Sequence, residues 1–151
     1  MNRHGNGIIR SMYPSEDALT NRVIGSAIEV HRHLGPGLLE STYEECLALE
    51  LGDRGLAFRR QALIPVIYKG TRLDAWYRVD FLLDALVVEV KAVEKILPVH
   101  EAQLLTYMAL LDRPCGLLLN FHTPVLKDGI RRLALKGRGT RDEGGKATGR
   151  Q

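Results

Sequence analysis

Cysteine is scarce in this chain, which has two, Cys46 and Cys115, among 151 residues. Both lie in apolar segments, so we expect two buried thiols and no disulfide framework. Structural disulfides are typical of secreted proteins, and the first residues of the chain also lack the apolar segment of a signal peptide. We therefore expect a cytoplasmic protein in a reducing compartment.

Long hydrophobic runs are absent as well. No uninterrupted apolar run approaches the roughly 20 residues of a membrane-spanning helix, so we expect no membrane association through such a helix. Hydrophobic residues nevertheless make up 45% of the sequence. A chain of this length and composition can bury a proper core, and we expect one ordered domain over residues 15–135.

An excess of charge of one sign is also missing from most of the chain. The formal net charge is +3, and residues 136–151 supply all of it with five basic and two acidic side chains. Nucleic-acid-binding proteins usually show a basic face, so the neutral body counts modestly against tight binding. Residues 136–151 are too polar to bury apolar surface and are predicted to form a disordered basic tail, and residues 1–14 a flexible N-terminus.

The segment Val79–Lys91 places charged residues inside strongly apolar sequence. Its pattern predicts two buried strands joined by a turn at Asp84–Ala85. Side chains alternate along a strand, so Glu89 and Lys91 share a face, and antiparallel pairing brings Asp80 within reach of Glu89. Charges in buried strands are rare unless they are paired or bind a metal. Two interpretations are open: a structural Glu89–Lys91 ion pair at a sheet edge, or a metal site.

The metal-site interpretation follows from the chemistry of oxygen ligands. A hard cation such as Mg²⁺ prefers oxygen, which two carboxylates and the backbone carbonyl of Val90 would supply. Lys91 would be a point charge beside the cation, able to orient an attacking water or to offset charge on a phosphate. An Asp followed one strand later by Glu-x-Lys is the arrangement of metal-dependent nucleases, although this spacing alone is a weak signal.

Two helices are predicted ahead of these strands. The first covers residues 15–34 and ends at Gly35-Pro36-Gly37, where proline cannot continue a helix. The second covers Glu44–Gly52, with Ser41 and Glu44 spaced as a capping box. Glu40 lies just before this second helix. It is either a surface carboxylate that favours the helix dipole or a third acidic ligand held at a fixed point of the fold.

The remaining elements are predicted from the change of hydrophobic period: strands over Ala62–Tyr68, Cys115–Phe121 and Ile130–Leu135, and a helix between Pro98 and Asp112. Pro65 favours an edge or a bulge in the first of these strands. Arg59 and Arg60 precede that strand and form either a phosphate contact or a solvated pair. The order of elements predicts an α/β domain, with a central mixed sheet flanked by helices.

Four motifs occur in one order along the chain: Gly37, Glu40 and Tyr43 as G-x-x-E-x-x-Y, then Asp80, then Glu89-x-Lys91, and finally H-E-A-Q-L-L-T-Y from His100. Over about Leu19–Leu135 the chain therefore resembles the GxxExxY protein family, which is grouped with the PD-(D/E)xK nuclease-like superfamily. Val79 stands where the superfamily name has proline. Proline is not a ligand there, so this departure concerns the pattern more than the chemistry.

The resemblance implies a restriction-endonuclease-like core in which Glu89 and Lys91 lie on a central strand beside Asp80. It implies a Mg²⁺ site, with Mn²⁺ as a substitute, and the expected ligands are Glu40, Asp80, Glu89 and the carbonyl of Val90. The expected catalytic residues are Lys91, Glu89, Asp80 and Gln103. Gln103 would help to hold the carboxylates or the scissile phosphate, or else be an ordinary polar edge of its helix.

Two functions are therefore predicted. The first is a metal-dependent nuclease that hydrolyses phosphodiester bonds in DNA or RNA. The alternative is a catalytically silent module of the same fold that binds nucleic acid or a protein partner, with a homodimer left open. Metal binding by Asp80 and Glu89 separates the two, because only catalysis requires it.

Overall fold

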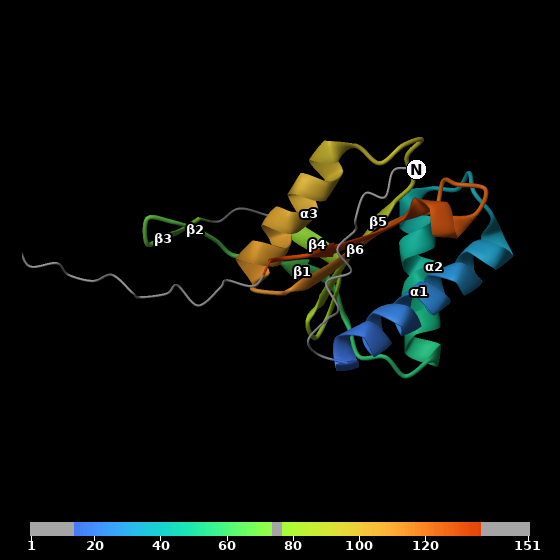
Figure 1. Ribbon diagram of the computed structural model, residues 1–151, viewed down its shortest axis with the longest axis horizontal. Helices are drawn as coiled ribbons and strands as arrows, with labels where there is room; N and C mark the ends of the chain where they lie inside the picture. The colour runs from blue at the N-terminus through green and yellow to red at the C-terminus, as the bar shows by residue number, and fades with distance from the viewer. Residues whose placement is uncertain (1–13, 74–76, 137–151) are drawn as a thin grey trace, which may run out of the picture.

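The computed structural model describes residues 14–73 and 77–136 of the chain (Figure 1). The elements are, in order, α1 (Pro14–Leu34), α2 (Glu40–Asp53), β1 (Arg59–Leu63), β2 (Val66–Tyr68), β3 (Thr71–Leu73), β4 (Arg78–Leu83), β5 (Leu86–Lys91), α3 (Pro98–Leu111), β6 (Cys115–Asn120), the 3-10 helix η1 (Leu126–Gly129) and β7 (Ile130–Ala134). The predicted flexible N-terminus and basic tail lie, apart from Pro14 and Lys136, outside the described residues. No helix in the described ranges is long and apolar enough to cross a membrane.

Five strands form the main sheet in the order β1-β4-β5-β6-β7. β5 and β6 are parallel, and the other neighbouring pairs are antiparallel, so the sheet is mixed. The predicted α/β fold with a central mixed sheet is therefore confirmed. β5 is the third of the five strands, so a Glu89–Lys91 pair at a sheet edge is wrong.

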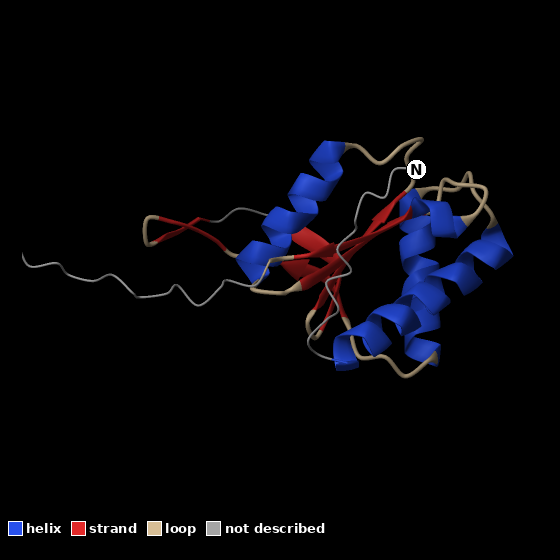
Figure 2. Cartoon of the chain, viewed as in Figure 1, coloured by secondary structure: helices blue, strands red, loops and turns tan. Residues whose placement is uncertain are grey.

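Helices cover both faces of this sheet (Figure 2). α1 and α2 pack on one face, and we call the apolar side chains buried there the α1/α2 cluster. α3 packs on the other face over a second set of apolar side chains, the α3 cluster. α3 packs closely on β6 at Gly116, where an added Cβ atom would come 2.5 Å from the sulfur of Met108. The result is a three-layer α/β/α sandwich.

α2 begins earlier than the sequence predicts. Its N-cap residue is Leu39, whose side chain makes no capping hydrogen bond, so the predicted capping box of Ser41 and Glu44 is wrong. The Tyr43 hydroxyl instead fixes the preceding loop, since it accepts a bond from the Leu38 N–H and donates one to the Gly35 carbonyl. Glu40 is consequently the first residue of α2, and Glu44 stands one turn further along the same side.

The predicted strand Ala62–Tyr68 is two strands. The Ile64 N–H still bonds to the Tyr77 carbonyl at 2.8 Å, but Pro65 has no N–H and interrupts the ladder. Beyond it, β2 and β3 pair only with each other in a separate two-stranded sheet. We call this β2–β3 hairpin the arm, and Figure 1 shows it projecting from the main sheet.

Candidate functional site

The site is built where β4 changes the face of the sheet that its side chains occupy. Residues two apart in a strand normally share a face, yet Phe81 belongs to the α1/α2 cluster and Val79 to the α3 cluster. Asp80 lies between them. On the neighbouring strand, Gln61 has a positive φ of 48°, and its side-chain amide donates to Asp80 Oδ1 at 3.1 Å. Asp80 therefore lies on the β1–β4 pair at the point where the side chains of β4 pass from the α3 cluster to the α1/α2 cluster.

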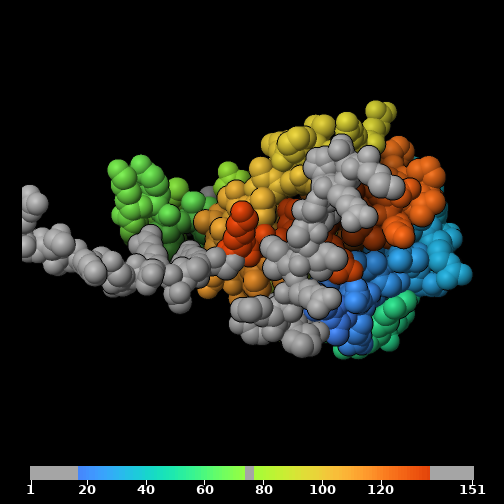
Figure 3. Space-filling model, in the orientation of Figure 1, coloured from blue at the N-terminus to red at the C-terminus, as the bar shows by residue number. Residues whose placement is uncertain are grey.

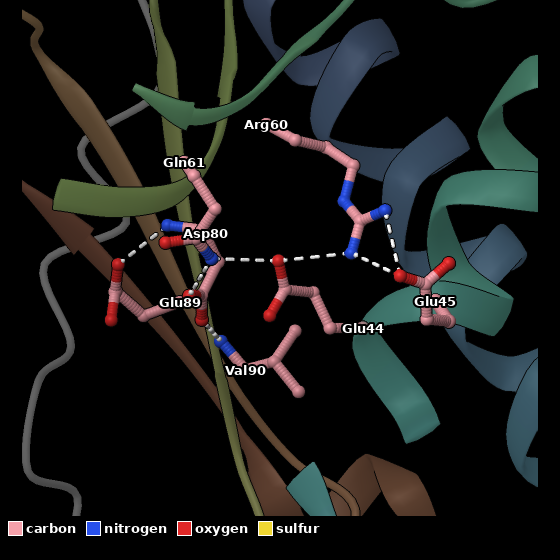
Figure 4. Close-up of polar contacts among 7 residues, drawn as sticks. All are labelled: Glu44, Glu45, Arg60, Gln61, Asp80, Glu89 and Val90. Atoms are coloured by element: carbon pink, nitrogen blue, oxygen red, sulfur yellow. Dashed lines mark hydrogen bonds and ion pairs between the residues drawn. The ribbon is translucent and has the colours of Figure 1, made fainter. Parts of the chain in front are cut away.

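Asp80 and Glu89 each complete the main-chain hydrogen bonding of the other's strand (Figure 4). The Asp80 N–H donates to Glu89 Oε1 at 2.9 Å, and the Val90 N–H donates to Asp80 Oδ2 at 2.8 Å. The regular pairing of β4 with β5 runs from Leu83–Leu86 to Phe81–Val88. Beyond that point, carboxyl oxygens stand in for strand carbonyls, which fixes both carboxyl groups on rigid backbone.

Glu89 is buried beside a single lysine. Its residue surface is 7% exposed, and Lys91 Nζ lies 4.0 Å from Glu89 Oε2, as alternation along β5 predicts. Burial raises the pKa of Glu89 to about 8, and the charge of Asp80 adds to the rise. The Asp80 N–H and the Lys91 ammonium oppose this shift only in part. Lys91 therefore does not compensate the charge that Glu89 would carry when ionised.

Burial also raises the pKa of Asp80. The charges of Glu44 and then Glu40 raise it further, against the hydrogen bonds that the carboxylate accepts from Val90 and Gln61. Glu40 contributes to the raised pKa of Glu89 as well. The structure thus brings the three acidic residues named from sequence into one electrostatic neighbourhood, with excess negative charge.

Glu44 is a member of this neighbourhood that sequence reasoning missed. Its Oε1 accepts a bond from the Gln61 amide at 2.7 Å and one from Arg60 Nη2 at 3.2 Å. Figure 4 shows its carboxyl pointing from α2 toward Gln61 and Asp80. The available signal was its spacing of four from Glu40, which places both side chains on one face of α2.

Arg60 is held by acidic side chains. It forms ion pairs with Glu44 at 3.2 Å and Glu45 at 3.1 Å, and its guanidinium lies 6.0 Å from the centroid of the Phe81 ring. Its hydrogen bond to Glu45 is the largest cause of its raised pKa. Arg60 is therefore neither a solvated pair with Arg59 nor a free phosphate contact, and it offsets part of the charge of α2.

On the α3 side, Gln103 reaches the site through Tyr107. The Gln103 side chain is hydrogen-bonded to the Tyr107 hydroxyl, which opposes a rise in the pKa of Tyr107 caused by burial and then by the charge of Glu89. Tyr107 is 8% exposed, and Gln103 is exposed. Tyr107, which sequence analysis did not name as a site residue, is thus a residue of α3 whose pKa depends on the charge of Glu89.

Asn120 fixes the chain just beyond Lys91, a role without a sequence signal. It is paired with Lys91 across the parallel β5–β6 ladder and is 2% exposed. Its amide donates to the Val93 carbonyl at 2.8 Å and accepts from the Val93 N–H at 3.1 Å. The backbone that follows Lys91 is therefore held against β6 by Asn120.

The donor set can be tested against a divalent cation. Among the described residues, no three His, Cys, Asp or Glu side chains form a closed metal-binding group. Mg²⁺ does not need one, because proteins commonly hold it with one or two carboxylates while it keeps several waters. Asp80 and Glu89 offer hard oxygen atoms, and burial together with neighbouring acidic side chains raises the pKa of both carboxyls. The residues present therefore fit a hydrated Mg²⁺ ion.

The raised pKa of Glu89 has a consequence for stability in EDTA. Between its unfolded pKa near 4.5 and about 8, the folded protein binds more protons than the unfolded chain, so stability falls as pH rises. We expect Glu89→Gln to flatten this fall by on the order of 2–4 kcal/mol. Urea unfolding from pH 5 to pH 8.5 measures it, with the exposed Glu94→Gln as control. Parallel curves for wild type and Glu89→Gln would contradict a protonated Glu89.

Comparison with known proteins identifies a family to which the chain is similar. A family model described as the PD-(D/E)XK nuclease superfamily matches residues 17–133. No curated protein and no solved structure matches the chain. The matched range contains every site residue described above, from Glu40 in α2 to Asn120 in β6.

Proposed function

The chain belongs to the PD-(D/E)XK nuclease superfamily, and from this premise we propose that it is a metal-dependent nuclease that hydrolyses phosphodiester bonds in nucleic acid. Within the superfamily, we propose that it is one of the GxxExxY proteins, whose motifs its own resemble. The catalytic domain in this proposal is residues 15–135, followed by a basic tail, and its location is the cytoplasm.

The observation that carries the proposal is the pairing of Asp80 with Glu89. A half-buried and a buried carboxyl, both with raised pKa values, lie together with a single lysine, whose ammonium is 4.0 Å from Glu89. A structural ion pair is stabilising only when its charges are balanced and its hydrogen bonds are complete. Groups whose pKa values are shifted by burial and by a specific charged neighbour are typical of functional sites. A divalent cation would supply the balance that Lys91 alone does not.

In the proposed site, Asp80, Glu89 and the Val90 carbonyl hold Mg²⁺, with Mn²⁺ as a substitute, and Glu40 acts as a further acidic ligand. When bound, the cation would polarise the phosphate and lower the pKa of the attacking water. Loading requires Glu89 to lose its proton, so affinity should rise with pH up to about 8.

The chain's own residues position the reactants. The Lys91 ammonium stands beside Glu89, where it can orient a water molecule or offset charge on the phosphate. Asn120 holds the end of β5 behind Lys91. Gln103 acts through Tyr107, whose pKa is raised by burial and by the charge of Glu89. Gln61 fixes the Asp80 carboxyl from the opposite strand.

The alternative is a module of this fold that binds nucleic acid or protein without cleaving it. The neutral charge of residues 1–135 favours this alternative, because a nuclease that binds nucleic acid tightly usually presents a basic face. Binding without a divalent cation is the property that would distinguish this module from the enzyme.

Incubation with labelled DNA and RNA, single- and double-stranded, in Mg²⁺, Mn²⁺ or EDTA tests the proposal. We expect cleavage of at least one substrate with Mg²⁺ or Mn²⁺ and none in EDTA, since the carboxyls lack compensating charge without the cation. Glu89→Gln, purified identically, controls for contaminating nucleases, and Glu94→Gln should cleave as wild type does. Failure to cleave any substrate, together with no effect of Mn²⁺ on melting, would favour the silent module.

A further inference from the structure

The arm contributes nothing to either buried cluster. Its six strand residues pair only with each other, and all but Val66 are exposed. Figure 3 shows the arm, in green, standing out from the described body. A two-stranded hairpin on its own is marginally stable in water. Side chains on such an element are better explained by what they contact outside the body than by what they stabilise within it.

The arm and its base expose an unusual amount of apolar and aromatic surface. The exposed fractions are 54% for Leu63, 63% for Ile67, 62% for Tyr68, 44% for Leu73 and 49% for Tyr77. Single exposed apolar side chains are ordinary, but several on one projecting element mark a binding surface. Tyrosine is also a residue whose ring can stack while its hydroxyl stays in water.

The charge of this segment identifies the kind of partner. Residues 59–78 contain five basic residues and one acidic residue, although residues 1–135 as a whole are neutral. Arg60 is neutralised by α2, but Lys69, Arg72 and Arg78 are exposed. None of the described residues of β1, β2 or β3 is acidic. The basic face that overall composition fails to show is therefore gathered on the arm and on the strand ends at its base.

Aromatic and basic groups are presented together at the tip. Lys69 Nζ lies 5.4 Å from the centroid of the Tyr68 ring. A base can stack on such a ring while the ammonium meets the adjoining phosphate, which is how proteins hold unpaired strands. In a duplex the faces of the bases are already stacked on each other. A second copy of the chain fits less well, since strand pairing through the arm would bring Lys69 and Arg72 against like charges.

The arm is continuous with the site. β1 and β4 form its base, where the Ile64 N–H donates to the Tyr77 carbonyl. Gln61 and Asp80, which bond to each other at 3.1 Å, lie on these same two strands. From Gln61 to Lys69 the chain can extend at most about 26 Å at the usual rise of a strand. A nucleic-acid strand that lies along the arm is thereby directed to the carboxyls of Asp80 and Glu89.

We propose that the arm binds single-stranded nucleic acid and guides it to Asp80 and Glu89, with Tyr68 and Tyr77 stacking on bases and Lys69, Arg72 and Arg78 contacting phosphates. The guiding role rests on the proposed nuclease function, whereas binding by the arm does not depend on it. The partner is thus recognised by its unpaired bases and its backbone charge.

Binding in EDTA tests the arm without catalysis. The full chain and Lys69→Glu/Arg72→Glu are titrated into a fluorescent single-stranded 20-mer and its duplex, at several salt concentrations, by anisotropy. We expect tighter single-strand binding by wild type, and a loss of at least tenfold in the variant. The slope of log affinity against log salt should become shallower by about 1.4, at roughly 0.7 per single-strand phosphate contact. Tyr68→Ala should weaken binding without changing that slope.

The matched control is Arg32→Glu/Lys127→Glu, which reverses two exposed cations away from the arm and should retain most of the affinity. Equal losses in the control and in the arm variant would overturn the proposal. So would equal losses on single strand and duplex, or a wild-type dimer in sedimentation analysis that the arm variant converts to monomer. The nuclease proposal is judged separately, by wild-type cleavage with Mn²⁺, which none of these binding results decides.

Discussion

Replacing Asp80 by Asn should abolish cleavage, by at least about 10³-fold, and weaken Mn²⁺ binding by more than about a hundredfold, while leaving the fold intact. The amide oxygen can still accept the Val90 N–H bond that Asp80 accepts at 2.8 Å. Its NH₂ group would face the amide of Gln61 less favourably, at a cost of about 1 kcal/mol. Relief from the charges of Glu44 and Glu40 offsets that cost, so in EDTA the variant should be about as stable as wild type, or more stable.

Thermal melting of wild type and Asp80→Asn, each in EDTA and in Mn²⁺, measures this. Mn²⁺ should raise the melting temperature of wild type and leave that of the variant unchanged. Asp84→Asn, in the exposed turn between β4 and β5, is the control and should respond to Mn²⁺ as wild type does. A large drop in the variant's melting temperature in EDTA, with no Mn²⁺ effect on wild type, would indicate a structural carboxylate and end the nuclease interpretation.

Replacing Lys91 by Ala should separate catalysis from metal binding. The ammonium is placed beside Glu89 to orient water or phosphate, so we expect cleavage to fall by roughly 10²–10⁴-fold. The carboxyls stay in place, because the main chain holds them and not the lysine. Mn²⁺ should therefore still raise the melting temperature of Lys91→Ala, as it does for wild type.

Lys95→Ala is the matched control, since Lys95 is an exposed lysine a few residues further along the chain. It should cleave nucleic acid as wild type does. If the essential role of Lys91 were instead to balance a buried ion pair, Lys91→Ala would lose roughly 3–5 kcal/mol of stability. Urea unfolding of both variants decides between these outcomes, and full cleavage by Lys91→Ala would remove the lysine from the mechanism.

Most of the fold follows from the hydrophobic period of the sequence. Pro98 starts α3 and Asp112 follows its end, as predicted, because proline at a helix start and a break in periodicity are local signals. The start of α2 was not predictable in this way. It depends on the Tyr43 hydroxyl, whose bonds reach back to the Gly35–Leu38 loop, and a local rule for capping boxes cannot include a contact of that kind.

The candidate site was likewise predictable only where it follows from local sequence patterns. Alternation along β5 places Glu89 beside Lys91, and antiparallel pairing brings Asp80 to Glu89. Gln61 and Glu44 meet Asp80 from other elements, and the change of face at Asp80 breaks the alternation on which sequence reasoning relies. These features follow from how β1, β4 and α2 pack in three dimensions, which no spacing in the sequence encodes.

The Asp80 and Glu89 carboxyls each accept a hydrogen bond from the backbone of the other's strand. These bonds affect how the residues at positions 80 and 89 should be interpreted when members of this family are compared. A lineage that lost activity would still be under selection to keep an acceptor at both positions, since each satisfies a backbone N–H. Retention of Asp or Asn at 80, and of Glu or Gln at 89, would then record the architecture of the sheet. The Lys91 ammonium makes no hydrogen bond to the described part of the chain, only the long contact to Glu89. Among relatives, position 91 is therefore where the loss of chemistry should first leave its trace.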